Sequence, residues 1–165
     1  MEIRHWTKDD GTEAVSRIYE ESWKYAYKGI VPQSYMDARP AGTWAPLLGI
    51  PAVHTLVLVQ DGKLTGTASV GASRLPAMQG WGELISIYFL PEYMGQGYGK
   101  QLLEAALQEL HEMGFDDVYL WVLEENRRAR RFYEKNGFAF SGETAQAKIG
   151  GKTLTELQYR RVREK

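Results

Sequence analysis

The sequence predicts an α/β (α+β) fold in which a central, mixed and mostly antiparallel β-sheet is flanked by helices. Three observations predict it. Apolar runs of strand length alternate with helical segments, short glycine-containing turns join two pairs of strands, and glycines follow the expected helices. The 165 residues are enough for one domain with its own core, and we expect this single domain to span residues 1–165.

The first half of the chain is expected to form a strand, a helix and a hairpin. Residues 2–6 are typical of a short strand, and residues 9–27 carry apolar side chains at three- and four-residue spacing, which indicates a helix. Four prolines between residues 30 and 52 favour a loop with short helical turns. Residues 53–70 predict two strands joined by an Asp-Gly pair, which favours a two-residue turn because both positions accept positive φ.

The second half is expected to alternate strands with helices and to end in a second hairpin. Residues 82–90 and 116–123 are nearly all apolar, which predicts strands that are buried on both faces. A helix is expected to run from the end of a glycine-rich stretch to Met113, and residues 126–137 predict another. Residues 137–162 predict a hairpin that turns at a Gly-Gly pair.

Composition argues against several classes of partner. The formal net charge of −1 gives no reason to expect binding to nucleic acid or to a membrane. The sequence contains no run of about 18 apolar residues, so a membrane-spanning helix is not expected. The N-terminus also lacks a signal-like apolar segment, and we therefore expect a cytoplasmic protein. The chain has no cysteine for a disulfide or an acyl-enzyme, and His5, His54 and His111 are too scattered to predict a metal site.

The stretch "PEYMGQGYGK" places Gly95, Gly97 and Gly99 at the start of a helix. A glycine within a helix costs about 1 kcal/mol relative to alanine, so a ligand close to the backbone would explain the cluster. A nucleoside-triphosphate loop needs Ser or Thr after Lys100, and a dinucleotide loop needs glycine at Lys100 itself; neither is present. Two interpretations remain: a pyrophosphate site built from backbone N–H groups and the helix dipole, or a flexible connection.

Two segments resemble the GCN5-related N-acetyltransferase (GNAT) family. The segment "ISIYFLPEYMGQGYGKQLL" is similar to the family's acetyl-CoA-binding strand, loop and helix, with Gly97 and Gly99 on the two glycine positions. Met94 departs from the family's Gln or Arg. The segment "LEENRRARRFYEKNGF" resembles a later family stretch with the pattern Asn, six residues, Tyr, three residues, Gly-Phe. The order of elements also matches, so the resemblance covers nearly the whole chain and implies a GNAT-like acyl-CoA N-acyltransferase fold.

The resemblance implies an enzyme that uses acetyl-CoA as cosubstrate, without a metal, and acetylates an amine. In the family the strand edge pairs with the pantetheine arm, the loop holds the pyrophosphate mainly through backbone N–H groups, and an asparagine binds the arm. Asn126 matches that asparagine and is also suited to cap its helix. The implied cofactor-binding residues are Ile87, Tyr88, Phe89, Gly95, Gln96, Gly97, Tyr98, Gly99, Lys100 and Asn126.

Two residues are candidates for acid and base. Tyr133 matches the family tyrosine that protonates the sulfur of CoA; the alternative is that it belongs to a buried helical stripe. Glu83 is the one carboxylate of the central strand and lies where several family members have a base. Simple alternation puts Glu83 on the same face as Ile87 and Phe89, where apolar neighbours would raise its pKa. The alternative puts Glu83 at the solvent-exposed end of the strand.

The acceptor is expected to be a primary amine of a small molecule. The absence of cysteine favours direct attack of this amine on acetyl-CoA, and a covalent intermediate on another nucleophile is the alternative. Rings and a carboxylate near the end of the first helix suit a cationic amine: Glu21, Trp23, Tyr25 and Tyr27. A protein N-terminus as acceptor, a non-catalytic CoA-binding sensory domain and a nucleotide-binding domain are the alternatives. The four arginines of residues 127–131 form a solvated face or contact the 3′-phosphate of CoA. Open strand edges make a homodimer a further expectation by analogy.

Overall fold

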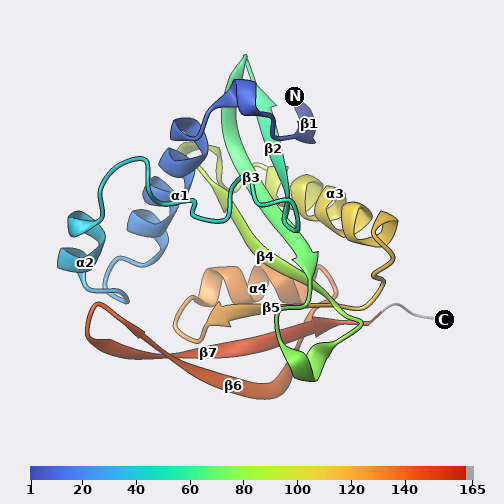
Figure 1. The fold of residues 1–165 in the computed structure, drawn as a ribbon. Coiled ribbons are helices and arrows are strands. Elements are labelled where there is room, and N and C mark those ends of the chain that lie inside the picture. The colour runs from blue at the N-terminus through green and yellow to red at the C-terminus, as the bar shows by residue number, and fades with distance from the viewer. Residues whose placement is uncertain (163–165) are drawn as a thin grey trace.

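Seven strands form one sheet in the order β1-β2-β3-β4-β5-β7-β6 (Figure 1). The computed structural model describes residues 1–162. Neighbouring strands are antiparallel except for β4 and β5, which are parallel, so the predicted mixed and mostly antiparallel sheet is confirmed. The strands are β1 (Glu2–His5), β2 (His54–Gln60), β3 (Lys63–Ala72), β4 (Gly82–Phe89), β5 (Val118–Leu123), β6 (Ala139–Ile149) and β7 (Lys152–Arg161).

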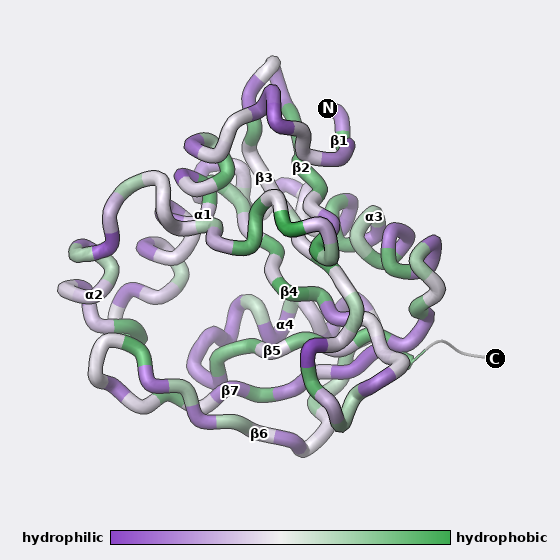
Figure 2. The backbone as a smooth tube through the Cα atoms, viewed as in Figure 1, coloured by the Kyte–Doolittle hydropathy of each residue, from purple (hydrophilic) through white to green (hydrophobic). Residues whose placement is uncertain are grey.

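Four α-helices cover the sheet: α1 (Glu13–Ala26), α2 (Gln33–Ala38), α3 (Tyr98–Glu112) and α4 (Arg127–Lys135). The inner side of α3 packs into the main core, and residues of α4 lie against the same core. α1 and α2 belong to a second cluster on the other side of the sheet. Hydrophobic residues gather where β3, β4 and β5 meet (Figure 2). None of the helices within residues 1–162 is long and apolar enough to cross a membrane.

The turns follow the chemistry of their residues. Asp61 and Gly62 have φ of 51° and 75°, as the predicted two-residue turn between β2 and β3 requires. Gly150 and Gly151 have φ of 61° and 82° between β6 and β7. The predicted helix over 9–27 begins later than expected, at Glu13, because a 3₁₀ turn and a glycine with positive φ precede it.

A β-bulge in β4 overturns the predicted alternation of that strand. Ser69 of β3 pairs with Ser86 while Val70 pairs with Leu84, so Ile85 is an extra residue on β4. The bulge reverses the facing of the residues that follow it. Ile87 and Phe89 therefore pack into the main core with α3, whereas Glu83 lies on the opposite face with Tyr88.

β4 and β5 pair only at their beginnings and then diverge. Their ladder consists of Gly82 with Val118 and Glu83 with Tyr119. Residues 85–88 of β4 are half-buried, so the prediction that this strand is buried on both faces is wrong for its second half. Because β5 turns away toward β7, the edge of β4 beyond Glu83 faces open space instead of a neighbouring strand.

Candidate active site

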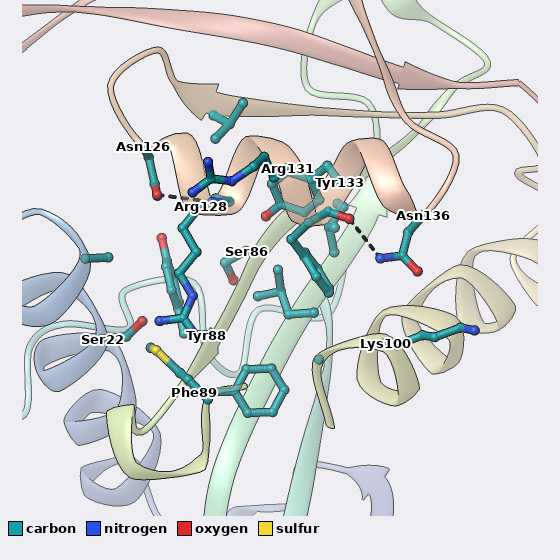
Figure 3. Close-up of a pocket in the computed structure, with 18 of the residues that line it drawn as sticks. Ser22, Ser86, Tyr88, Phe89, Lys100, Asn126, Arg128, Arg131, Tyr133 and Asn136 are labelled. Carbon is teal, nitrogen blue, oxygen red and sulfur yellow. Dashed lines mark hydrogen bonds between the residues drawn. The ribbon is translucent and has the colours of Figure 1, made fainter. Parts of the chain in front are cut away.

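A cavity of about 900 Å³ lies where β4 and β5 diverge (Figure 3). Residues 84–89 of β4 form its floor, and α4, the end of α1 and the loop before α3 form its sides. In Figure 3 the side chains of Arg128, Arg131 and Tyr133 extend from α4 over the cavity, with Tyr88 and Phe89 beneath them. The unpaired edge of β4 offers backbone N–H and C=O groups to an extended ligand, as a strand edge does when it binds a peptide.

The three glycines around the start of α3 serve different structural purposes. Gly95 and Gly97 have φ of 75° and 87°, a conformation that other residues adopt at a cost, and both line the cavity. Gly97 is the N-cap residue of α3, and no side chain caps this helix end. The first N–H groups of α3 are therefore left for a ligand, and the helix dipole favours an anion there.

Gly99 lies within α3, lines the cavity and also allows α3 to approach α4 closely. A Cβ atom at Gly99 would lie 3.1 Å from the ring of Phe132 on α4. The flexible-connection interpretation is therefore wrong for Gly99. Met94, which departs from the family pattern, is half-buried against the main core and also lines the cavity.

The walls of the large cavity carry positive charge. The cationic lining residues are Lys100, Arg128, Arg131 and Lys135, and no carboxylate lies among the described lining residues. Arg130 does not line the cavity but donates to the hydroxyl of Tyr159 at 3.0 Å and to the carbonyl of Glu124 at 2.9 Å. Of the four arginines in residues 127–131, Arg128 and Arg131 line the cavity and are therefore able to contact an anionic ligand. The positive charge of this wall is complementary to a long ligand that carries several phosphates, as CoA does.

Tyr133, Tyr88 and Tyr27 form a cluster of phenols beside the unpaired edge of β4. Burial raises the pKa of all three hydroxyls, so each stays protonated at neutral pH. Within residues 1–162 the Tyr133 hydroxyl forms no hydrogen bond with another side chain or with the backbone. Tyr133 also packs on Phe132 and Phe138, as a buried helical stripe would, and its role as acid stays a prediction.

Asn126 is the N-cap residue of α4. Its Oδ1 accepts a hydrogen bond from the backbone N–H of Ala129 at 3.3 Å, which confirms the predicted cap. Asn126 also lines the large cavity. The cap fixes the start of α4, and the Asn126 carboxamide also lies close to the hydroxyl of Tyr27.

A second cavity of about 200 Å³ adjoins the first. Four residues line both cavities and so form the junction between them: Tyr27, Ile85, Tyr88 and Trp121. The remaining walls of the small cavity combine apolar, aromatic and charged groups: Trp23, Arg74, Glu83, Leu123, Ile149 and Glu156. Two carboxylates against one arginine give this cavity the opposite sign of charge to the large one.

Glu83 is buried in the wall of the small cavity and is only 3% exposed. Arg74 binds its carboxylate through two nitrogens, at 3.0 Å to Oε1 and 2.7 Å to Oε2. The hydroxyl of Tyr119 donates to Oε1 at 3.1 Å. The alternative that Glu83 lies at a solvent-exposed strand end is therefore wrong, and its role as base stays a prediction.

The other predicted residues differ in their placement. Ile87, Tyr88, Phe89 and Lys100 line the large cavity, whereas Gln96 and Tyr98 are not lining residues. The Gln96 side chain donates to the carbonyl of Glu92 at 3.0 Å. Of the predicted acceptor residues, Trp23, Tyr25 and Tyr27 line a cavity, and Glu21 instead pairs with Arg17 on the surface of α1.

Several lining residues were missed by sequence reasoning, among them Arg74, Ser86, Trp121 and Glu156. Glu156 had a detectable signal, because it is the one charged residue between Lys152 and Arg160. The histidines lie elsewhere: His5 and His54 both bond to Glu109, at 3.0 and 2.6 Å. Among residues 1–162 no group of three or more His, Cys, Asp or Glu side chains could hold a metal ion.

Comparisons with known proteins agree with this architecture. The family model described as "Acetyltransferase (GNAT) family" matches residues 12–138. An uncharacterized N-acetyltransferase of Archaeoglobus fulgidus is 33% identical over 81% of this chain and 89% of its own length. The spermidine N(1)-acetyltransferase of Thermoplasma acidophilum is 29% identical over 84% of this chain and 88% of its own.

Solved structures show the same fold. The PaiA N-acetyltransferase from Thermoplasma acidophilum, solved in complex with coenzyme A, superposes with a TM-score of 0.75 at 23% identity, covering 98% of both chains. A ribosomal-protein-alanine N-acetyltransferase from Brucella melitensis gives a TM-score of 0.75 at 22% identity, over 99% of this chain and 100% of that one.

Proposed function

This chain belongs to the acetyltransferase (GNAT) family and is an acetyl-CoA-dependent N-acetyltransferase, and from this premise we propose that its acceptor is a small molecule with a primary amine. One observation carries the proposal: two joined cavities of opposite charge meet beside Tyr27 and Tyr88. The large, cationic cavity suits the phosphates of the cosubstrate. The small cavity, with its carboxylates and rings, suits a cationic amine.

For the cosubstrate we propose three kinds of contact. The backbone of Ile87, Tyr88 and Phe89 pairs with the amide groups of the arm, and the Asn126 carboxamide reaches the same arm. The backbone of residues 95–100, which includes Gln96 and Tyr98, holds the pyrophosphate at the start of α3. The side chains of Arg128 and Arg131 add to the attraction from the α4 side.

Tyr133 is the proposed acid. Burial raises the pKa of its hydroxyl, so the proton is present at neutral pH and is available to the sulfur as the C–S bond breaks. The hydroxyl has no competing partner among the described residues. The side chain extends from α4 over the floor made by β4 (Figure 3), next to the junction where the two substrates would meet.

The size of the small cavity favours a short acceptor. At the roughly 30 Å³ that a water molecule occupies in the liquid, a cavity of about 200 Å³ holds six or seven non-hydrogen atoms. A short alkylamine, one arm of a polyamine or an amino acid fills this space. The spermidine acetyltransferase of Thermoplasma acidophilum, 29% identical, supports the polyamine class. The L-amino acid N-acyltransferase MnaT of Escherichia coli, 25% identical, supports amino acids as a second candidate.

The test is Tyr133→Phe assayed by release of free CoA thiol with a panel of small primary amines. We expect turnover to fall at least tenfold while the dissociation constant of acetyl-CoA stays within twofold, because the hydroxyl is proposed to act only as sulfur leaves. Tyr35→Phe is the matched control, since Tyr35 is a half-buried tyrosine of α2 that lines neither cavity. Unchanged turnover in Tyr133→Phe would remove this residue from the mechanism.

The assay panel also decides between acceptor classes. Acetylation of peptides with free N-termini, with no turnover of small amines, would favour the protein-acetylating alternative. We propose that residues 1–165 form a single transferase domain. A homodimer stays a prediction, and β1 and β6, the two edge strands of the sheet, are the places where a second copy could pair.

A further inference from the structure

The two carboxylates of the small cavity differ in what surrounds them. We propose that Glu156 on β7 is the general base that takes the proton of the acceptor amine, and that Glu83 instead holds the cavity wall in place. This inference rests on the proposed function, because it assigns a catalytic role within the same acceptor cavity. Neither the predicted motifs nor the family resemblance pointed to Glu156.

Glu83 is already committed to protein partners. Both of its carboxylate oxygens are bound by Arg74, and one of them accepts a second bond from the hydroxyl of Tyr119. A carboxylate paired with a guanidinium through two hydrogen bonds is a poor proton acceptor, because protonation would break a charge-assisted pair in a buried place. The pair instead links β4, β5 and the segment before residue 76, which fixes one wall of the cavity.

Glu156 has no such partners. It lies on β7 opposite Leu123 of β5, is half-buried, and forms no hydrogen bond or ion pair through its side chain with the residues that the structure describes. Burial raises the pKa of its carboxyl group, with no offsetting charge. A carboxylate in this state is a better base near neutral pH than one with an ordinary pKa.

The groups that face the same cavity do not neutralise Glu156. Tyr27 follows α1 and Tyr88 lies on β4, and burial keeps both phenols protonated. Arg74 is bound to Glu83, so the pair as a whole is neutral. The small cavity therefore carries one uncompensated negative charge, on Glu156, and the aromatic rings of Trp23 and Trp121 add faces that attract a cation.

The proposed step conserves protons and electrons. The acceptor ammonium gives one proton to the Glu156 carboxylate, and the nitrogen lone pair that this exposes forms the new N–C bond to the acetyl carbon. The C–S bond breaks, its electron pair leaves on sulfur, and Tyr133 gives the sulfur a proton. The second nitrogen proton returns to the Tyr133 oxygen, and Glu156 releases its proton to solvent. The net products are the amide, CoA thiol and one proton.

The experiment compares Glu156→Gln with Glu83→Gln across pH 5 to 10, using spermidine and 1,3-diaminopropane as acceptors. We expect Glu156→Gln to lower kcat by about 10²–10⁴-fold, the usual contribution of a general base. It should also abolish the acidic limb that the carboxylate gives the pH profile of kcat/KM. Glu83→Gln should keep that limb. Glu143→Gln is the matched control, because Glu143 is exposed on β6 and lines neither cavity.

A stability measurement supplies a second readout that needs no acceptor. Because burial raises the folded-state pKa of Glu156, the wild-type protein should lose stability as the pH rises through that value. Glu156→Gln should lack this loss, so its stability relative to wild type should increase between pH 4 and pH 8. A flat difference would contradict an unpartnered buried carboxylate.

The outcomes separate the two proposals. If the wild-type enzyme acetylates no small amine, the proposed acceptor class is wrong. If it does, and Glu156→Gln keeps both its turnover and its acidic limb, the role of Glu156 is overturned while the proposed function stands. Loss of the limb in Glu83→Gln alone would return the role of base to Glu83.

Discussion

Replacement of Gly97 by alanine tests how the loop before α3 holds its ligand. Gly97 has φ of 87° and no atom lies within 4 Å of the position that a Cβ would occupy, so alanine meets no steric clash in the protein itself. The left-handed conformation costs a residue with a Cβ roughly 1–2 kcal/mol. For a chain of this size, each kcal/mol lowers Tm by about 2–4 °C.

Gly114 provides a matched control at the other end of the same helix. Its φ is 96° and its Cβ position is equally open, but it does not line the cavity. We expect Gly97→Ala and Gly114→Ala to lose similar stability in urea unfolding. Only Gly97→Ala should weaken acetyl-CoA binding, by at least tenfold in calorimetry, because its methyl group occupies space that the pyrophosphate needs. Equal affinity in the two variants would refute a backbone-bound pyrophosphate at this loop.

Two further predictions concern stability. Arg4 and the backbone of Thr7 lower the pKa of Asp10 to about 2, so the stability that this carboxylate contributes is present above about pH 4 and lost as the pH falls toward 2. Urea unfolding of Asp10→Asn should lack that acid-dependent loss, and a loss equal to that of wild type would show that other groups cause it. Leu102 is fully buried on α3, and Leu102→Ala should cost about 2–5 kcal/mol in the same assay. A cost below 1 kcal/mol would contradict the packing of α3 on the sheet.

Local chemistry made most of the fold predictable from the sequence. Asp-Gly and Gly-Gly pairs placed both hairpins, since positive φ at two successive positions admits few other residues. Asn126 marked the start of α4 through its cap. The bulge at Ile85 had no such signal, because an extra residue in an apolar strand leaves the composition unchanged. It was the bulge that misplaced Glu83 relative to Ile87.

The large cavity was the more predictable part of the site, because residues close in sequence build much of it. The loop of residues 95–100 and the helix that carries Asn126 and Tyr133 are local segments, and both border the large cavity. The small cavity is built across β4, β5, β7 and the end of α1. Its contents depend on tertiary placement, so the pairing of Arg74 with Glu83 and the isolation of Glu156 required the structure.

The binding of acetyl-CoA tests the account most directly, because both proposals depend on the large cavity. Thermal unfolding would be compared in the presence of acetyl-CoA, CoA, ATP and NAD. At a concentration 100 times its dissociation constant, a ligand adds about 2.7 kcal/mol of stability. The account predicts a rise in Tm with acetyl-CoA and CoA and none of that size with ATP or NAD. No rise with either CoA species at millimolar concentration would contradict it.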